Sequence, residues 1–140
     1  MMKSKKIEFG FILRLEKGEE IVSTLLKFLE DKKISSGYFT GIGAVSEVEL
    51  GHYSLKSKEY SKKSFKEPFE IVSLIGNIAV MNGKKYVHSH IAISDKSMNV
   101  KAGHLTKALV AATCEINLID LKTEISRKFS KEIGLNLLDI

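Results

Sequence analysis

The chain has 140 residues, of which 44% are hydrophobic and 28% are charged, and it contains one Cys and one Pro. These values are typical of a globular protein and exclude a disulfide scaffold, a Pro-rich disordered chain and a membrane-spanning helix, because no apolar run reaches the ~18 residues that such a helix needs. The net charge is +5, but 20 of the 22 basic residues are Lys, and a composition poor in Arg does not favour sequence-specific DNA recognition.

The N-terminal part predicts a strand and then a helix. Residues 7–15 are rich in aromatic and β-branched side chains and predict a strand. From Glu19 to about Lys33, apolar residues recur at spacings of three and four, which predicts a helix with one apolar face and Gly37 as its stop. The basic N-terminus holds only a short apolar stretch, so we expect no signal peptide and a cytoplasmic protein.

The next segment predicts a strand with an irregular start. Residues 38–55 alternate with a period of two from Ala44 to Tyr53, and Gly41 and Gly43 indicate a bulge or a close approach of two backbones. Residues 56–67 are polar and rich in Lys, which is typical of a loop or of an exposed edge hairpin.

Residues 69–93 predict a β-hairpin around Asn82-Gly83. This dipeptide favours a type I′ turn, because both turn positions need a positive φ. With a two-residue loop, the residue numbers of each cross-strand pair add up to 165, so that His88 faces Asn77 and His90 faces Ile75. The opposite face carries the better core residues, which are Val87, Ser89, Ile91 and Ile93.

The C-terminal part completes the predicted fold. Residues 94–103 are expected to form a polar turn, Leu105–Leu109 a helical turn and residues 110–121 a strand, with an apolar tail that packs back as an edge element. We therefore predict one α+β domain over residues 1–140, with a core from about 7 to 138. Its mainly antiparallel sheet is expected to be flanked by helices.

Three histidines form the candidate site. His88 and His90 project from one face of the predicted strand with Cα atoms ~6.5 Å apart, which suits two ligands of one metal ion. His104 follows a Gly, where a turn would return a third nitrogen to the same place. Three imidazoles leave a coordination position open for water or substrate; zinc is the expected ion, although iron, nickel and copper also accept imidazole. The alternative is a half-exposed polar strand face without metal.

Other polar residues are candidates for roles beside this site. Asn77 is a candidate hydrogen-bond partner of His88, and Glu115 a candidate fourth ligand or general base. His52 alternates onto the face of Val48 and Leu50, so we interpret it as structural or as lying at a strand end, and we interpret Cys114 as an inert buried thiol. The metal-binding motif of cupins, in which a Glu follows the HxH pair by four or five residues, is absent because Ser94 and Asp95 stand at those positions. No catalytic elbow, P-loop or dinucleotide motif is present. No catalytic residue is assigned.

The ordered segments SGYFTGIGAVSEVELGHY, EPFEIVSLIGNIAV, HSHIAISD and GHL resemble the PPC domain, also called domain of unknown function 296. This domain occurs alone in bacteria and archaea and beside AT-hook motifs in plant nuclear proteins. The resemblance covers about residues 7 to 138 and implies a PPC-like antiparallel sheet with helices, a homotrimer, and a metal site, often zinc, at His88, His90 and His104. Ala102 stands where the family prefers Gly, and the AT-hook is absent.

Three functions remain open at this point. The first is a cytoplasmic metal-binding trimer that binds or transforms a small molecule at the open metal position. The second is a DNA-associated protein that uses Lys3, Lys5, Lys6 and the Lys56–Lys66 segment as a diffuse phosphate-binding surface. The third is a trimeric protein-interaction module. The sequence does not decide whether the protein is an enzyme.

Overall fold

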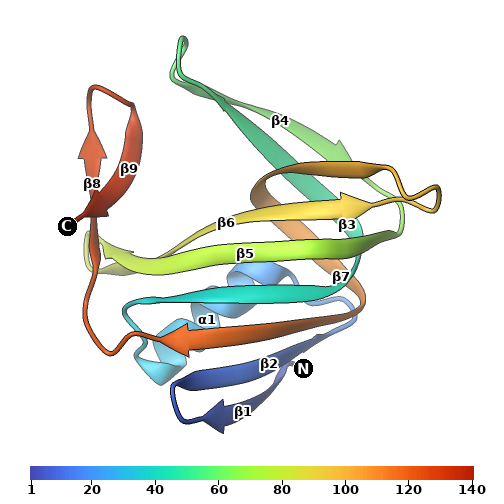
Figure 1. Cartoon of the computed structure of the whole chain (residues 1–140), viewed down its shortest axis with the longest axis horizontal. Helices are drawn as coiled ribbons and strands as arrows, with labels where there is room; N and C mark the ends of the chain where they lie inside the picture. The colour runs from blue at the N-terminus through green and yellow to red at the C-terminus, as the bar shows by residue number, and fades with distance from the viewer.

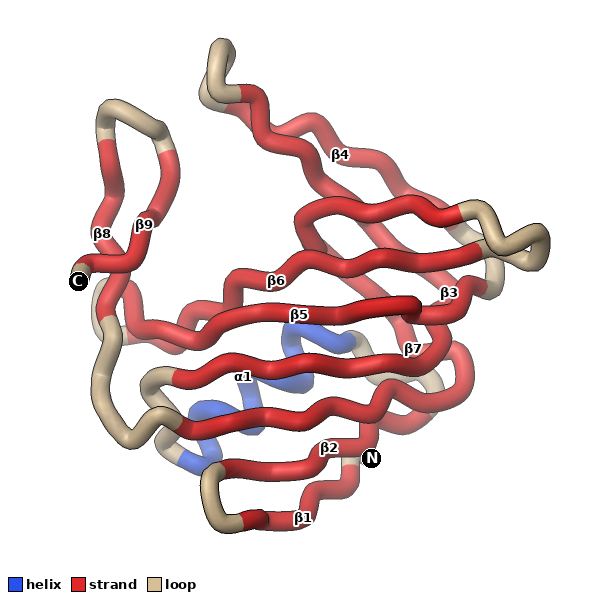
Figure 2. Tube along the Cα trace, viewed as in Figure 1, coloured by secondary structure: helices blue, strands red, loops and turns tan.

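A computed structural model describes residues 1–140 and consists of nine strands and one helix (Figures 1 and 2). In chain order, the elements are β1 (Lys3–Ile7), β2 (Gly10–Glu16), α1 (Ile21–Lys32), β3 (Gly37–Ser54), β4 (Glu59–Phe65), β5 (Phe69–Met81), β6 (Lys84–Ser94), β7 (Val100–Asp120), β8 (Ser126–Ser130) and β9 (Leu135–Asp139).

The nine strands form one sheet that bends back on itself through its two longest members. The first half of β3 pairs with β5 and with the second half of β7, whereas the second half of β3 pairs with β4 and with the first half of β7. β6 pairs with β5 on one side and with the start of β7 on the other. The strands β7, β3, β5 and β6 therefore form a closed circuit of neighbours, in which a short turn joins the end of β6 to the start of β7 (Figure 1).

The helix covers one face of the sheet and lies behind it in Figure 2. Its buried side chains Ile21, Leu25, Phe28 and Leu29 recur at helical spacing and join the core of 23 residues. The Glu20 carboxylate caps the helix by accepting hydrogen bonds from the backbone N–H groups of Val22 and Ser23. The helix begins and ends close to the prediction, but Lys33 in the left-handed conformation ends it, four residues before Gly37.

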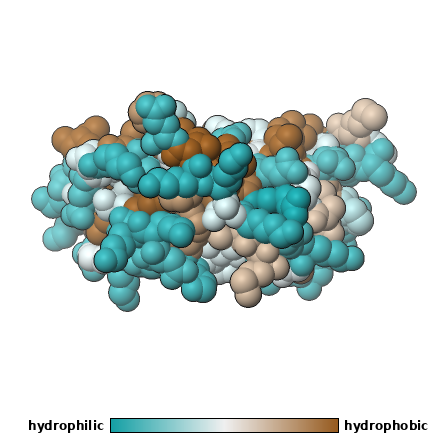
Figure 3. Space-filling view, turned by 90° about the horizontal axis from the view of Figure 1, so that it is seen from below, coloured by the Kyte–Doolittle hydropathy of each residue, from teal (hydrophilic) through white to brown (hydrophobic).

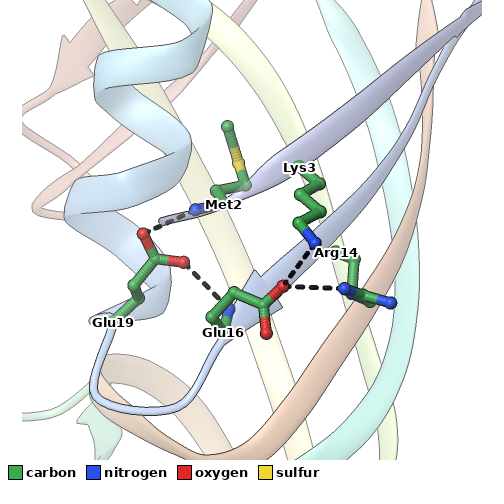
Figure 4. A network of polar contacts seen from close by, with 5 residues as sticks. All are labelled: Met2, Lys3, Arg14, Glu16 and Glu19. Carbon is green, nitrogen blue, oxygen red and sulfur yellow. Dashed lines mark hydrogen bonds and ion pairs between the residues drawn. The ribbon is translucent and has the colours of Figure 1, made fainter.

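Glu19 ties the N-terminal hairpin to the start of the helix (Figure 4). One of its carboxylate oxygens accepts the Met2 N–H at 2.8 Å, and the other accepts the Glu16 N–H at 2.9 Å. The Glu16 side chain pairs with Arg14 at 2.8 Å and with Lys3 at 4.0 Å. These surface ion pairs contribute little to stability. The hairpin is held by the pairing of β2 with β7 along its whole length, and the two hydrogen bonds of Glu19 add to this pairing.

The β8–β9 hairpin stands apart from the other strands, at the left of Figure 1. It joins the sheet through one parallel bridge between Val80 and Ser126. Its turn contacts the β3–β4 hairpin, because the Tyr53 hydroxyl donates to the Ile133 carbonyl at 2.7 Å and Lys58 donates to the Lys131 carbonyl at 2.9 Å. The tail is thus an edge element, as predicted, but in the form of a hairpin.

Several predicted elements are confirmed. The hairpin over residues 69–93 has the predicted register, and both Asn82 (φ 51°) and Gly83 (φ 74°) have a positive φ. The Lys-rich segment 56–67 contributes β4 and forms the expected edge hairpin with β3. The mainly antiparallel sheet is also confirmed.

The predicted helical turn over Leu105–Leu109 is wrong, and a single helix rather than several flanks the sheet. These residues belong to β7, which already begins at Val100 and so also shortens the predicted polar turn of residues 94–103. The pairing of β7 with β3 is interrupted by irregularities between Val45 and Glu47 and between Glu49 and Leu50. Because each irregularity shifts the alternation, buried positions come to be three residues apart, as in a helix. The predicted strand 7–15 corresponds largely to β2, and the hairpin that β2 forms with the preceding β1 was not predicted.

The sheet face opposite the helix is left uncovered in its central part. We call this the outer face; its exposed apolar side chains are Ile12, Tyr38, Ile42, Val72 and Ile75. Figure 3, which views the molecule from the β1 end, shows a mostly hydrophilic surface with separate hydrophobic patches. The structure contains no helix of the length and apolarity that crossing a membrane requires.

Candidate metal centre

The three histidines come together on the outer face of β6 and β7. His88 and His90 lie two residues apart on β6, so both point away from the core, whereas Ser89 and Ile91 point into it. His104 lies on β7, directly opposite His90 in the antiparallel register. The structure therefore brings the predicted residues together: the turn between β6 and β7 returns the chain, and the strand pairing places His104 opposite His90.

The imidazoles are close enough to share one ion. Their ring centroids are 5.3 Å apart for His88 and His90, 5.3 Å for His88 and His104, and 5.5 Å for His90 and His104. One nitrogen from each ring lies within 4.8 Å of the others. Ligand nitrogens around a tetrahedral ion are ~3.4 Å apart when each bond is 2.0–2.1 Å, so small side-chain rotations complete the set.

Two observations fit the cluster to a metal ion. The Nδ1 atom of His104 is buried and has no hydrogen-bond partner in the protein, and a buried polar atom is normally satisfied. Burial and the nearby positive charge of Arg127 also lower the pKa of His88 to about 4, and burial lowers the pKa of His104. Both rings are therefore neutral at neutral pH, which is the form that binds metal.

Aromatic side chains and one arginine border the cluster. Tyr60 of β4 packs against His104 with ring centroids 5.1 Å apart. Tyr86 of β6 lies under the Arg127 guanidinium at 5.0 Å. Together with His88, these residues surround a small cavity of about 70 Å³. On its other side, His88 borders a more open hollow of about 380 Å³ that also contains His90 and Ile75.

The other predicted residues lie outside the cluster. His52 is exposed near the end of β3, where it continues the alternation of the buried Val48 and Leu50, in agreement with the strand-end interpretation. Glu115 lies near the far end of β7 and is not among the clustered ligand atoms. Asn77 does face His88, but its amide oxygen accepts from Arg127.

Two further expectations concern residues near the sheet core. Cys114 is fully buried, and burial raises the pKa of its thiol to about 12, as expected for an inert side chain. Ala102 does not have a positive φ and pairs with Ala92, so the Ala in place of Gly causes no strain. The neighbouring Gly103 is the position without space for a side chain, because a Cβ there would lie 2.9 Å from the Gly51 carbonyl oxygen.

Sequence reasoning missed Arg127, Tyr60 and Tyr86. Tyr60 and Arg127 lie on strands whose contact with the cluster depends on distant pairing, so spacing along the chain gives no signal for their contact. Tyr86 lies two residues before His88 on β6, so the alternation of this strand already places it on the face of the histidines. Arg127 gave one signal, since it is one of only two arginines and lies in an alternating segment near the C-terminus.

Solved structures resemble this chain over nearly its whole length. A candidate DNA-binding protein from Bacteroides thetaiotaomicron is 37% identical, with a TM-score of 0.96 over 99% of this chain and 97% of that one. A metal-containing protein from Archaeoglobus fulgidus is also 37% identical, with a TM-score of 0.86 over 95% of this chain and 97% of that one. A plant- and prokaryote-conserved (PPC) protein from Pyrococcus horikoshii is 30% identical, with a TM-score of 0.88 over 100% and 95% of the two chains.

No curated protein matches this sequence. Residues 2–122 match the model of the Plants and Prokaryotes Conserved (PCC) domain. This match covers most of the 140 residues and agrees with the similarity to the Pyrococcus protein. The chain therefore belongs to the Plants and Prokaryotes Conserved domain family.

Proposed function

We propose that the protein binds one divalent transition-metal ion, zinc, through His88, His90 and His104. The observation that carries the proposal is the convergence of three imidazoles, of which one nitrogen each lies within 4.8 Å of the others. The buried Nδ1 atom of His104, which has no hydrogen-bond partner, adds to this support. The 37% identity to a metal-containing protein supports it. A ligand set of three nitrogens suits zinc in an open site, and the remaining coordination position is then free for a small molecule.

The function of such a site is small-molecule binding or metal-assisted chemistry. A bound ion supplies a Lewis acid that polarises an oxygen of the ligand or lowers the pKa of a water molecule. The chain itself contributes an apolar hollow beside His90 and the small cavity beside His88. These two spaces limit the ligand to a small molecule.

The assembly that accompanies this function is a homotrimer. The support for a homotrimer is the apolar surface of the outer face, on which Ile42, Val72 and Ile75 are each more than half exposed. Ile75 pairs with His90 across β5 and β6, so this apolar surface continues up to the metal site. Covering this surface in an assembly removes apolar area from water, which stabilises the assembly by ~25 cal/mol per Å².

A second candidate function is DNA association through the exposed Lys-rich β3–β4 hairpin. The name of the Bacteroides relative supports it. Against it, Lys62 pairs with Glu49, and Lys66 and Lys107 pair with Glu47, so part of the positive charge is neutralised within the protein. A trimeric interaction module is the third candidate. Duplex DNA that shifts at low salt but not at high salt would support the second candidate.

The deciding experiment is elemental analysis of untagged protein, purified without chelator and expressed as metal per chain. We expect about one zinc ion per chain in the wild type and none in His88→Ala or His104→Ala. His52→Ala is the matched control, because His52 is an exposed histidine outside the cluster, and it should keep full occupancy. Full occupancy in either cluster variant, or no metal in the wild type after zinc is supplied, contradicts the proposal.

A further inference from the structure

Arg127 is a buried charge that has no ion pair. It is 9% exposed and is the one charged residue among the buried side chains. No carboxylate lies within 4.0 Å of its guanidinium, whereas Arg14, the other arginine, pairs with Glu16 at 2.8 Å. A buried charge without a counter-charge is costly, and proteins normally pair such groups.

The partners that Arg127 does have are neutral. One terminal nitrogen donates to the Asn77 amide oxygen at 2.5 Å, and the other donates to the Asn136 carbonyl at 2.7 Å. The plane of the guanidinium lies over the Tyr86 ring, and the buried Nε atom has no hydrogen-bond partner. These contacts fix the orientation of the side chain, but they leave its charge and its Nε–H group unsatisfied.

The surroundings of Arg127 are those of the histidine cluster. Arg127, His88 and His104 border the same cavity of about 70 Å³, and none of the residues around it is acidic; the other members are Tyr60, Tyr86, Leu135, Asn136 and Leu137. The hollow on the other side of His88 also lacks an acidic residue. With a divalent ion bound to three neutral imidazoles, this region would carry several positive charges and no negative one.

We propose that the missing counter-charge comes from the ligand: the site takes a small molecule with an oxoanion group, a carboxylate or a phosphate, which binds between the metal ion and Arg127. This inference rests on the proposed metal function and adds the chemical class of its ligand. Arg127 is then a binding residue that selects anions, because a guanidinium donates paired hydrogen bonds to such groups.

The dimensions of the two spaces limit the ligand. About 10–15 Å³ of such a cavity holds one water molecule, so a cavity of about 70 Å³ has room for a group of the size of a carboxylate or a phosphate. The rest of the molecule has to extend past His88 into the hollow of about 380 Å³, where Tyr38 and Ile75 offer apolar surface. A short organic acid or a small phosphate ester has this shape.

The test uses the full-length protein loaded with Co²⁺, whose visible absorption reports changes in metal coordination. Acetate, inorganic phosphate and acetamide, the neutral analogue of acetate, are titrated at constant ionic strength. We expect acetate or phosphate, but not acetamide, to change the spectrum of the wild type. In Arg127→Gln, the metal content should persist and the dissociation constant of the anion should rise about tenfold or more. Arg14→Gln is the matched control and should bind anions like the wild type.

Each outcome separates this inference from the metal proposal. A wild type that binds Co²⁺ but neither anion, or an Arg127→Gln variant that binds anions like the wild type, overturns the inference and leaves the metal site intact. The second result would also mean that Arg127 only anchors the β8–β9 hairpin. A wild type that binds no metal overturns both proposals. If Arg127→Gln does not fold, Arg127→Met replaces it, because Met keeps an apolar stem and removes the charge, and anion affinity equal to that of the wild type overturns the inference.

Discussion

His90 and His104 lie directly opposite each other on adjacent antiparallel strands, with ring centroids 5.5 Å apart. Their pairing depends on the turn between β6 and β7, in which the Asp95 carboxylate accepts the backbone N–H groups of Ser97 and Asn99. A slip of one residue in this register would turn His104 to the other face of the sheet. The geometry of the cluster is therefore a property of the strand register.

Metal binding should stabilise the fold. An ion that binds the folded chain at about 100 times its dissociation constant adds about 2.7 kcal/mol to the free energy of unfolding. Removing the metal with a chelator should therefore lower the Tm by several degrees, measured by circular dichroism, and zinc should restore it. In His104→Ala neither treatment should change the Tm, whereas His52→Ala should respond like the wild type. A metal-dependent Tm in His104→Ala would refute the assignment.

The outer face should control assembly. Val72 is 51% exposed and lies away from the histidines, so Val72→Glu places a charge on the apolar face without touching the metal site. We expect sedimentation analysis to show a trimer for the wild type and a 15.6 kDa monomer for the variant. The control is Leu55→Glu, because Leu55 is exposed in the turn between β3 and β4. A trimeric Val72→Glu variant would argue against this face as the interface.

Gly76 on β5 allows close packing behind His88. A Cβ at this position would lie 2.5 Å from Cζ of Phe39 and 2.7 Å from the His88 carbonyl oxygen. Gly76→Ala should therefore lower the free energy of unfolding by about 1–3 kcal/mol, measured by urea unfolding. Phe39→Leu in the same chain should recover part of this loss, because the shorter side chain leaves space. Strictly additive effects of the two substitutions would show that the contact does not cause the destabilisation.

Glu20 joins the helix to the sheet. Besides capping the helix, its carboxylate accepts the Ala108 N–H of β7 at 3.1 Å. Glu20→Ala should reduce the free energy of unfolding by about 1–2 kcal/mol, since it leaves three backbone donors without this partner. Glu30→Ala, at an exposed position of the same helix, should change it by less than about 0.5 kcal/mol. Equal losses in the two variants would contradict the role of the cap.

Cys114 should be unreactive in the folded protein. Burial raises the pKa of its thiol to about 12, so the reactive thiolate is scarce at pH 8 and is also shielded from reagents. An aromatic disulfide reagent should leave the native chain unlabelled and should label one thiol per chain in denaturant. Rapid labelling of the native protein would show that the strand pairs around Cys114 open readily.

Local sequence patterns were sufficient to predict the hairpin of β5 and β6 and the helix. The Asn82-Gly83 turn sets the register, and the alternation of side chains then places His88 and His90 on the face away from the core. Likewise, the apolar spacing from Ile21 to Leu29 predicts the face by which the helix packs. These features follow from the sequence because each depends on residues that are neighbours along the chain.

The path of β7 around His104 and the contact of Arg127 with the cluster depend on pairing between distant segments. Irregular pairing with β3 gives residues 105–109 of β7 a spacing like that of a helix, so this part of the strand could not be recognised before its partner was known. Arg127 reaches the cluster because it donates to Asn77, which is 50 residues away along the chain. No local rule encodes such a contact, since its free energy comes from the burial and pairing of groups that meet only when the sheet has closed.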